Sequence, residues 1–195
     1  VIGTYAKQAT EQKVATLIST GDKDIAQLVN PHVTLINTMS NTLLDEAGVL
    51  EKFDVPPSAI IDYLALMGDT ADNIPGIPKV GPKTAAKWLK QYETLENLVA
   101  HADEIKGKVG ESLRDNMDQL PLSKQLTTIK CDVELEHNIA DLTMRAPNVE
   151  KLRQMYNEME FKTWLSNLSA KSDENGEDNQ AGSEAVTLQK TAAVE

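Results

Sequence analysis

Short apolar runs and helical spacing alternate in the first third of the chain. Residues 1–12 have the spacing of a helix, and the apolar run 15–19, which ends before Gly21, predicts a buried strand. The segment DIAQLV predicts a short helix, and 33–38 alternates β-branched and polar residues as a second strand does. Helix, strand, helix and strand in this order are typical of the edge of an α/β sheet.

The apolar spacing becomes helical from residue 44 onward, and strands nearly disappear. Pro57 stands at the start of one expected helix, where its missing N–H costs nothing, and a Pro- and Gly-rich loop at 70–83 interrupts the series. The helices are expected at 45–53, 57–67, 84–92, 94–101, 110–129 and 148–165, and 131–135 is a further extended candidate. We therefore expect an α/β part at 1–56 and a mainly helical part at 57–168.

The composition changes after Leu168. Residues 169–195 are small, polar or charged, and their six acidic residues outnumber their two basic ones. Such a segment cannot bury enough apolar surface to fold, so it predicts a disordered acidic linker. The chain begins with Val1 in what reads as the middle of a helix, so it is expected to be a fragment of a longer protein.

Composition places the rest of the chain among ordinary globular proteins. Of its 195 residues 41% are hydrophobic and 25% are charged, which excludes a fully disordered, collagen-like or disulfide-stapled chain. Cys131 is the single cysteine, so it is expected to be a small buried residue in a reducing compartment, and no apolar run is long enough to cross a bilayer. The formal charge of −11 by itself argues against a nucleic-acid binder.

Two pairs of aspartates each follow a glycine at the end of an expected element. Asp22 and Asp24 come after the first strand, and Asp69 and Asp72 come after the helix that begins at Pro57. Side chains on loops at strand ends converge on the crevice in which α/β sheets bind ligands. Carboxylates that meet in one crevice repel each other unless hard cations lie among them, and Mg²⁺ or Mn²⁺ suits such ligands. Aspartate is also favoured as a helix cap and in turns, so each pair taken alone leaves a structural role open.

The segment GIPKVGPKTAAKWLK, residues 76–90, combines a tight turn with a run of lysines. Gly76 and Gly81 bracket a hairpin between two helices, and Pro82 begins the second helix, whose free N–H groups can bind a phosphate. If Gly81 needs a positive φ, a β-branched residue there would force the loop open. The lysines recur along one helix face with no acidic residue among them, at Lys79, Lys83, Lys87 and Lys90. A solvated lysine face usually interleaves glutamate, so this face favours phosphate binding.

These motifs together resemble the 5′ nuclease (flap endonuclease-like) family. GIPKVGPKTA looks like its helix-hairpin-helix, and STGDKD and LMGDTADNIPG precede it in the order and spacing of the family's carboxylate motifs. LSKQLTTIKCDVEL and MEFKTWL extend the similarity, which covers residues 1–168. The tail 169–195 is similar to the variable linker through which some members continue into proofreading-type and polymerase domains.

The resemblance implies an α/β fold, in which the edge of a PIN-like sheet is followed by a helical helix-hairpin-helix (H3TH) subdomain with its hairpin at 73–92. It also implies that Asp22, Asp24, Asp69 and Asp72 are catalytic residues that bind two Mg²⁺ or Mn²⁺ ions. A backbone phosphate of duplex DNA, in some members together with K⁺, would be bound by Gly76, Ile77, Lys79, Val80, Gly81, Lys83, Thr84 and Lys87.

The activity that the resemblance implies is that of a structure-dependent 5′→3′ exonuclease or flap endonuclease in DNA replication and repair. Its substrate would be DNA with a 5′ flap, a nick or a 5′ end. The family's further carboxylates and helical arch would lie upstream of Val1, so the chain alone is expected to bind DNA without cutting it. The parent is expected to be a monomeric, cytoplasmic, nucleoid-associated bacterial protein without membrane attachment.

Two other functions are consistent with part of the pattern. A haloacid-dehalogenase-like Mg²⁺-dependent phosphatase also has a DxD pair and a later GDxxD pair, but its DxD should end a strand directly and the lysine hairpin would be unexplained. A non-catalytic helix-hairpin-helix DNA-binding module explains residues 76–90 and leaves both aspartate pairs without a role.

Overall fold

The computed structural model describes residues 1–174, and side chains up to residue 168. The chain divides into two compact units, Val1–Leu142 and a second unit that begins at Thr143. The expected α/β part and most of the expected helical part thus lie in one unit. The described residues contain no helix that is long and apolar enough to cross a membrane.

The first unit contains a three-stranded sheet in the order β1-β2-β3. Strand β1 (Thr16–Ser19) pairs in parallel with β2 (Val33–Asn37), and β2 pairs antiparallel with β3 (Thr42–Leu44). On one face of the sheet Ile18 lies opposite Leu35, which lies opposite Leu44, and all three are buried. The other face exposes apolar side chains, since alternate residues of a strand point to opposite sides. The predicted α/β class is therefore confirmed.

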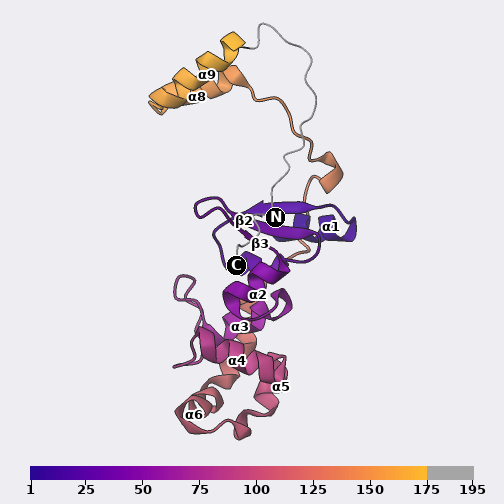
Figure 1. Cartoon of the computed structure of the whole chain (residues 1–195), viewed down its shortest axis with the longest axis vertical. Coiled ribbons are helices and arrows are strands. Elements are labelled where there is room, and N and C mark those ends of the chain that lie inside the picture. Colours follow the sequence, from indigo (N-terminus) through magenta and orange to yellow (C-terminus); the bar gives the residue numbers. More distant parts are fainter. Residues whose placement is uncertain (175–195) are drawn as a thin grey trace, which may run out of the picture. The chain divides into compact units, whose positions relative to one another are not determined.

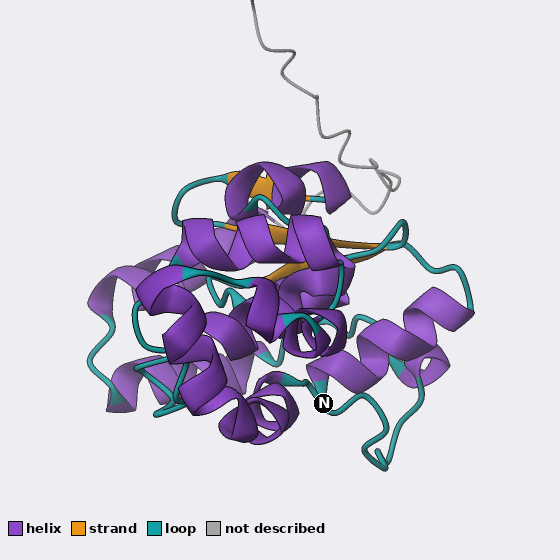
Figure 2. Ribbon diagram, turned by 90° about the horizontal axis from the view of Figure 1, so that it is seen from below, coloured by secondary structure: helices purple, strands orange, loops and turns teal. Residues whose placement is uncertain are grey.

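Helices make up most of the rest of this unit (Figure 2). They are α1 (Ile2–Glu11), η1 (Asp24–Leu28), α2 (Glu46–Phe53), η2 (Pro57–Ala59), α3 (Ile60–Met67), α4 (Pro82–Tyr92), α5 (Leu95–Ala100), η3 (Ala102–Glu104), α6 (Gly107–Asn116), η4 (Met117–Gln119), α7 (Leu120–Thr127) and η5 (Ile139–Asp141). Helix α3 is buried on most sides and packs against η1, α4 and α7. It connects the sheet region to the helical region, and the residues that follow it belong to the candidate site.

Within the first unit, the structure differs from the sequence-based secondary structure in three places. The helix expected at 110–129 is two helices, because Pro121 has no N–H for a helix interior and begins α7 instead. The segment 131–135 forms no strand, and Val133 N donates to Thr4 Oγ1 at 3.3 Å. Strand β3 was not expected, since its three residues are too few to show alternation.

The second unit contains a helical hairpin in which α8 (Val149–Glu158) and α9 (Lys162–Glu174) lie side by side (Figure 1). The helix expected at 148–165 is interrupted between them, where Glu160 has a φ of +57°. Phe161 and Trp164 pack edge to face with ring centroids 4.9 Å apart. Helix α9 also continues to Glu174, into the expected disordered linker, because Ala170, Lys171 and Glu174 favour helix. The remainder of that linker, 175–195, lies outside the described residues.

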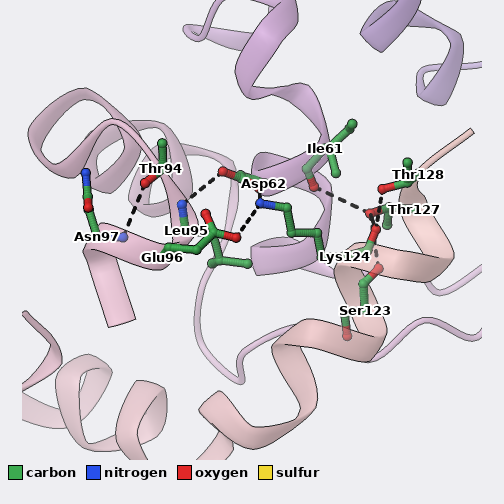
Figure 3. A network of polar contacts seen from close by, with 10 residues as sticks. All are labelled: Ile61, Asp62, Thr94, Leu95, Glu96, Asn97, Ser123, Lys124, Thr127 and Thr128. Carbon is green, nitrogen blue, oxygen red and sulfur yellow. Dashed lines mark hydrogen bonds and ion pairs between the residues drawn. The ribbon is translucent and has the colours of Figure 1, made fainter. Parts of the chain in front are cut away.

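A polar network around the buried Asp62 connects α3, α5 and α7 (Figure 3). The Asp62 carboxylate, 7% exposed, accepts a hydrogen bond from Leu95 N at 2.9 Å and pairs with Lys124 Nζ at 2.8 Å. Lys124 Nζ also lies 2.7 Å from Glu96 Oε1. The Asp62 carboxylate thus accepts a hydrogen bond from the first N–H of α5 and also pairs with the Lys124 ammonium of α7.

Asp62→Ala should lower the free energy of unfolding by about 2–3 kcal/mol, because it leaves the Leu95 N–H and the Lys124 ammonium without their buried partner. Glu96→Ala is the matched control. It removes the second carboxylate that pairs with Lys124. Because the Glu96 side chain is 67% exposed, the free energy of unfolding should fall by only about 0–1 kcal/mol. Urea unfolding of both variants measures the difference. Equal losses would contradict the role given to Asp62.

Candidate metal centre and nucleic-acid interface

Three of the four predicted carboxylates meet in one place. Asp24 begins η1 after the first strand, and Asp69 and Asp72 follow the C-terminus of α3. One carboxylate oxygen from each of these three residues lies within 4.8 Å of the other two. Their convergence brings together two loops that are about 45 residues apart in the sequence.

Asp22 has a different position in the same loop. Its Oδ1 accepts a hydrogen bond from Asp24 N at 2.9 Å, and its own N–H donates to Thr20 Oγ1 at 3.0 Å. The Asp22 carboxylate is not among the clustered oxygens, although it is close enough to raise the pKa of Asp24. Asp22 therefore closes a local Asx turn before η1, whose N-cap is Lys23, while Asp24 belongs to the cluster.

The loop that carries Asp69 and Asp72 is closed by backbone contacts. Asp69 and Ile74 exchange two hydrogen bonds of 2.9 and 2.8 Å, and Asp69 Oδ1 accepts from Ala71 N at 2.8 Å. Gly68 has a φ of +73°, and a Cβ on it would lie 2.3 Å from Gly76 N. Such a close crossing of two backbone segments is possible only because both Gly68 and Gly76 lack a side chain.

Residues of η4 and α7 hold the far end of this loop. Ser123 Oγ, which is buried, donates to the Pro75 carbonyl at 2.8 Å, and Gln119 Nε2 donates to the Gly76 carbonyl at 3.3 Å. Ile77 N donates to Leu66 O at 2.8 Å, which fixes the loop to α3. The carboxylates and the start of the hairpin are thus positioned by the same contacts.

The electrostatics of the cluster fit a divalent cation. Burial raises the pKa of Asp24, and the neighbouring charges of Asp22 and Asp69 raise it further. The Lys23 ammonium and the Ala71 amide lower the pKa of Asp69. Asp24 Oδ1 is buried and has no hydrogen-bond partner among the described residues, which is costly unless a cation or water binds it. Mg²⁺ and Mn²⁺ prefer oxygen ligands such as these carboxylates, and Asp24 Oδ1 is a carboxylate oxygen without another partner among the described residues.

The hairpin lies directly after this loop. Ile77 and Val80 are buried and fix it to the core. Between Gly76 and Gly81 the residue with a left-handed backbone is Lys79, with a φ of +69°, whereas Gly81 has a φ of −111° and space for a Cβ. The expectation that a positive φ could explain Gly81 is therefore wrong, because the turn is made two residues earlier.

The first helical turn of α4 and two exposed lysines of this helix lie next to the hairpin turn. Gly81 precedes Pro82 at the first helical position, and Thr84 is half-buried in that turn. Lys83 and Lys87 are exposed, and with Lys79 they form no ion pair among the described residues. Lys90 pairs with Asp54, so the expected four-lysine face is available for an anion at three positions.

Comparisons with known proteins agree with this geometry. Residues 1–54 match the model of the 5′-3′ exonuclease N-terminal resolvase-like domain, and residues 55–150 match that of the 5′-3′ exonuclease C-terminal SAM fold. The chain belongs to the 5′-3′ exonuclease family. Membership of this family overturns the phosphatase alternative, since both halves of the site lie in matched domains.

Curated members of the 5′-3′ exonuclease family resemble the chain over most of its length. It is 48% identical over 189 residues to DNA polymerase I of Pseudomonas aeruginosa, a match that covers 93% of this chain and 21% of the relative. It is 37% identical over 179 residues to DNA polymerase I of Bacillus caldotenax, covering 89% of this chain and 20% of the relative. The chain therefore spans about a fifth of the length of these relatives.

Solved structures share the fold at low identity. A T5 5′-exonuclease with bound zinc ions aligns with a TM-score of 0.60 and 18% identity, over 65% of this chain and 47% of that one. The catalytic core of Rad2 in complex with DNA substrate aligns with a TM-score of 0.50 and 14% identity, over 80% of this chain and 56% of that one. The expected PIN-like class is confirmed by these neighbours.

Sequence reasoning missed three residues that shape the site, namely Lys23, Gln119 and Ser123. Lys23 stands between two predicted ligands, and its charge in an acidic motif was the available signal. Gln119 and Ser123 lie more than 40 residues from the carbonyls they bind, and no local pattern marks such contacts.

Proposed function

We propose that this chain is part of a structure-dependent 5′→3′ exonuclease or flap endonuclease that hydrolyses DNA phosphodiester bonds. The observation that carries the proposal is the continuity of one loop. It begins with the clustered carboxylates Asp69 and Asp72 and leads, within ten residues, into a hairpin where Lys79 and Lys83 form no ion pair in the described part of the chain. The carboxylate cluster and the hairpin are therefore held at a fixed distance from each other. An enzyme that binds a duplex at one phosphate and cleaves it at another needs such a fixed distance.

Asp24, Asp69 and Asp72 would hold Mg²⁺ or Mn²⁺, with Asp22 beside them, in a site for two ions. When bound, such ions activate water and stabilise the attacking and leaving oxygens. The protein's part is to fix the carboxylates before the substrate arrives. The Asp69–Ile74 backbone pair does this on one loop, and the hydrogen bond from Asp24 N to Asp22 Oδ1 does it on the other.

The hairpin would bind the backbone of duplex DNA. At the start of α4, Pro82 has no N–H and the Thr84 N–H donates to the Gly81 carbonyl at 3.0 Å, so the lysines would supply most of the attraction for a phosphate. Contacts to phosphates carry no base information, and specificity should therefore follow the shape of the DNA. We assign this role to Gly76, Ile77, Lys79, Val80, Gly81, Lys83, Thr84 and Lys87, with K⁺ as a further ligand of the hairpin.

The relatives suggest the wider context. By its likeness to DNA polymerase I, the chain would be covalently joined to polymerase domains in a monomer that acts in DNA replication and repair. Its substrate would be DNA with a 5′ flap, a nick or a 5′ end. The site of action would be the bacterial cytoplasm at the nucleoid.

The test is a chimera in which this chain replaces the matched region of Pseudomonas aeruginosa DNA polymerase I. We expect the chimera to cleave a labelled 5′-flap duplex with Mg²⁺, to lose this activity in EDTA, and to leave a 3′-flap duplex intact. The unaltered relative serves as the positive control. Flap binding without cleavage by the chimera would overturn the proposal in favour of a non-catalytic DNA-binding module.

Removing the hairpin charges should weaken duplex binding equally for all sequences. Lys79→Gly keeps the left-handed turn, and Lys83→Ala lies in an exposed helical position, so the pair removes two charges without strain. The slope of log Kd against log salt should fall by roughly two units, about one for each lost phosphate contact. Lys90→Ala, on the same helix but paired with Asp54, should leave the slope unchanged. A changed base preference with an unchanged slope would contradict the assignment.

A further inference from the structure

Lys23 is the single basic residue of the segments 20–24 and 68–76, which carry the carboxylates. It stands between Asp22 and Asp24 in the sequence, and its Nζ lies 2.8 Å from Asp69 Oδ2 on the other loop. The Lys23 side chain is 39% exposed and that of Asp69 is 8% exposed. The pair therefore bridges the two loops and joins a partly exposed ammonium to a buried carboxylate.

Each oxygen of Asp69 has one partner. Oδ1 accepts from the Ala71 amide at 2.8 Å, and Oδ2 faces the Lys23 ammonium. Asp24 differs, because its Oδ1 is buried without a partner among the described residues. Oδ1 is already held by the Ala71 amide, so a cation that bridges Asp24 and Asp69 through Oδ2 competes with the ammonium for that oxygen.

The ammonium can leave this position at low cost. Its four-carbon stem is flexible, its side chain is more than a third exposed, and an ion pair with one such partner is weak. A divalent cation carries twice the charge and binds several oxygens at once, so it can compete with a single ammonium for Asp69. The remaining charges of the cluster are all negative, and without either cation they repel one another.

We propose that Lys23 is a built-in counter-ion of the carboxylate cluster, which a divalent cation must displace from Asp69, so that Lys23 lowers the affinity of the cluster for metal. This inference rests on the proposed metal-binding function of Asp24, Asp69 and Asp72. Lys23 acts through Asp69 and is thus a positioning residue. It keeps the two loops together when metal is absent and limits how tightly metal is retained.

The experiment measures Mn²⁺ binding to the full 195-residue chain by electron paramagnetic resonance. Lys23→Met keeps the length and apolar stem of the side chain but removes its charge, and the dissociation constant for Mn²⁺ should fall by about tenfold. Lys23→Arg retains the charge and should stay within about twofold of the unaltered chain. Lys108→Met, which removes an exposed charge on α6, corrects for the change in net charge and should have no effect.

Thermal unfolding gives a second readout. Without metal, Lys23→Met should melt at a lower temperature than the unaltered chain, because four carboxylates lose their counter-ion. With saturating Mn²⁺ its melting temperature should rise by more than that of the unaltered chain, since tighter binding stabilises the folded state further. A salt bridge with a purely structural role would lower the first value and leave the Mn²⁺ affinity unchanged.

The outcomes separate this inference from the proposed function. Equal or weaker Mn²⁺ binding by Lys23→Met, with clear binding by the unaltered chain, would overturn the counter-ion role and leave the metal site intact. Absence of Mn²⁺ binding in every variant would overturn the metal site, and the counter-ion role with it. Tighter binding by Lys23→Met alone supports both.

Discussion

Replacing Asp69 with asparagine should reduce Mg²⁺-dependent flap cleavage by the chimera by about a thousandfold or more. The amide keeps the shape of the side chain and can still accept from Ala71 N, so the loop should stay closed. What is lost is the negative charge that faces Asp24 and Asp72 within 4.8 Å. Groups that hold catalytic ions act as a unit, so the loss of one ligand removes most of the rate.

Single-turnover cleavage of the 5′-flap duplex separates this chemical effect from binding. Affinity for the flap should change little, because the hairpin lysines are untouched. Asp103→Asn, an exposed position in η3, is the matched control and should cleave at the unaltered rate. Cleavage by Asp69→Asn within tenfold of the control would remove Asp69 from the catalytic site.

Replacing Gly76 with valine should destabilise the first unit by about 4 kcal/mol or more, and DNA binding should fall with it. A Cβ at this position would lie 2.1 Å from the carbonyl carbon and oxygen of Met67. Those atoms belong to the last turn of buried helix α3, so they cannot move without unpacking the core. The loop that carries Asp69 and Asp72 would then open.

Gly81→Ala is the internal control for this prediction. Its new methyl group meets nothing within 4 Å, and its φ of −111° suits any residue. The variant should be as stable as the unaltered chain or more stable by about 0.5 kcal/mol, because alanine restricts the unfolded chain. Urea unfolding of the two glycine variants compares a crowded position with an open one in the same hairpin. Equal losses of unfolding free energy in the two variants would contradict the close packing of Gly76 against Met67.

The sequence was informative where the chemistry depends on local order. The glycine before each aspartate pair, and the Pro and Gly spacing of the hairpin, are short-range signals, and they place Asp24, Asp69 and Asp72 at element ends that do meet. Pro57 and Pro82 likewise mark the starts of helical segments, because a missing N–H is tolerated only there.

Features that depend on distant contacts were not predictable. The crossing of Gly68 and Gly76 explains why Gly76 must be glycine, yet the motif made Gly81 look equivalent. Lys79 adopts a positive φ because its buried neighbours Ile77 and Val80 fix the turn, which residue preference alone argues against. The pairing of Lys90 with Asp54 removes one member from an apparently uniform lysine face.

The central claim is that carboxylates from two separate loops bind one divalent cation. Anomalous diffraction from crystals of the chain soaked in Mn²⁺ locates the ion directly. The account predicts a peak bonded to carboxylate oxygens of both Asp24 and Asp69, at about 2.2 Å, with the Lys23 ammonium displaced from Asp69. A Mn²⁺ ion bound elsewhere, with Asp24 Oδ1 still without a ligand and Lys23 still paired with Asp69, would contradict it.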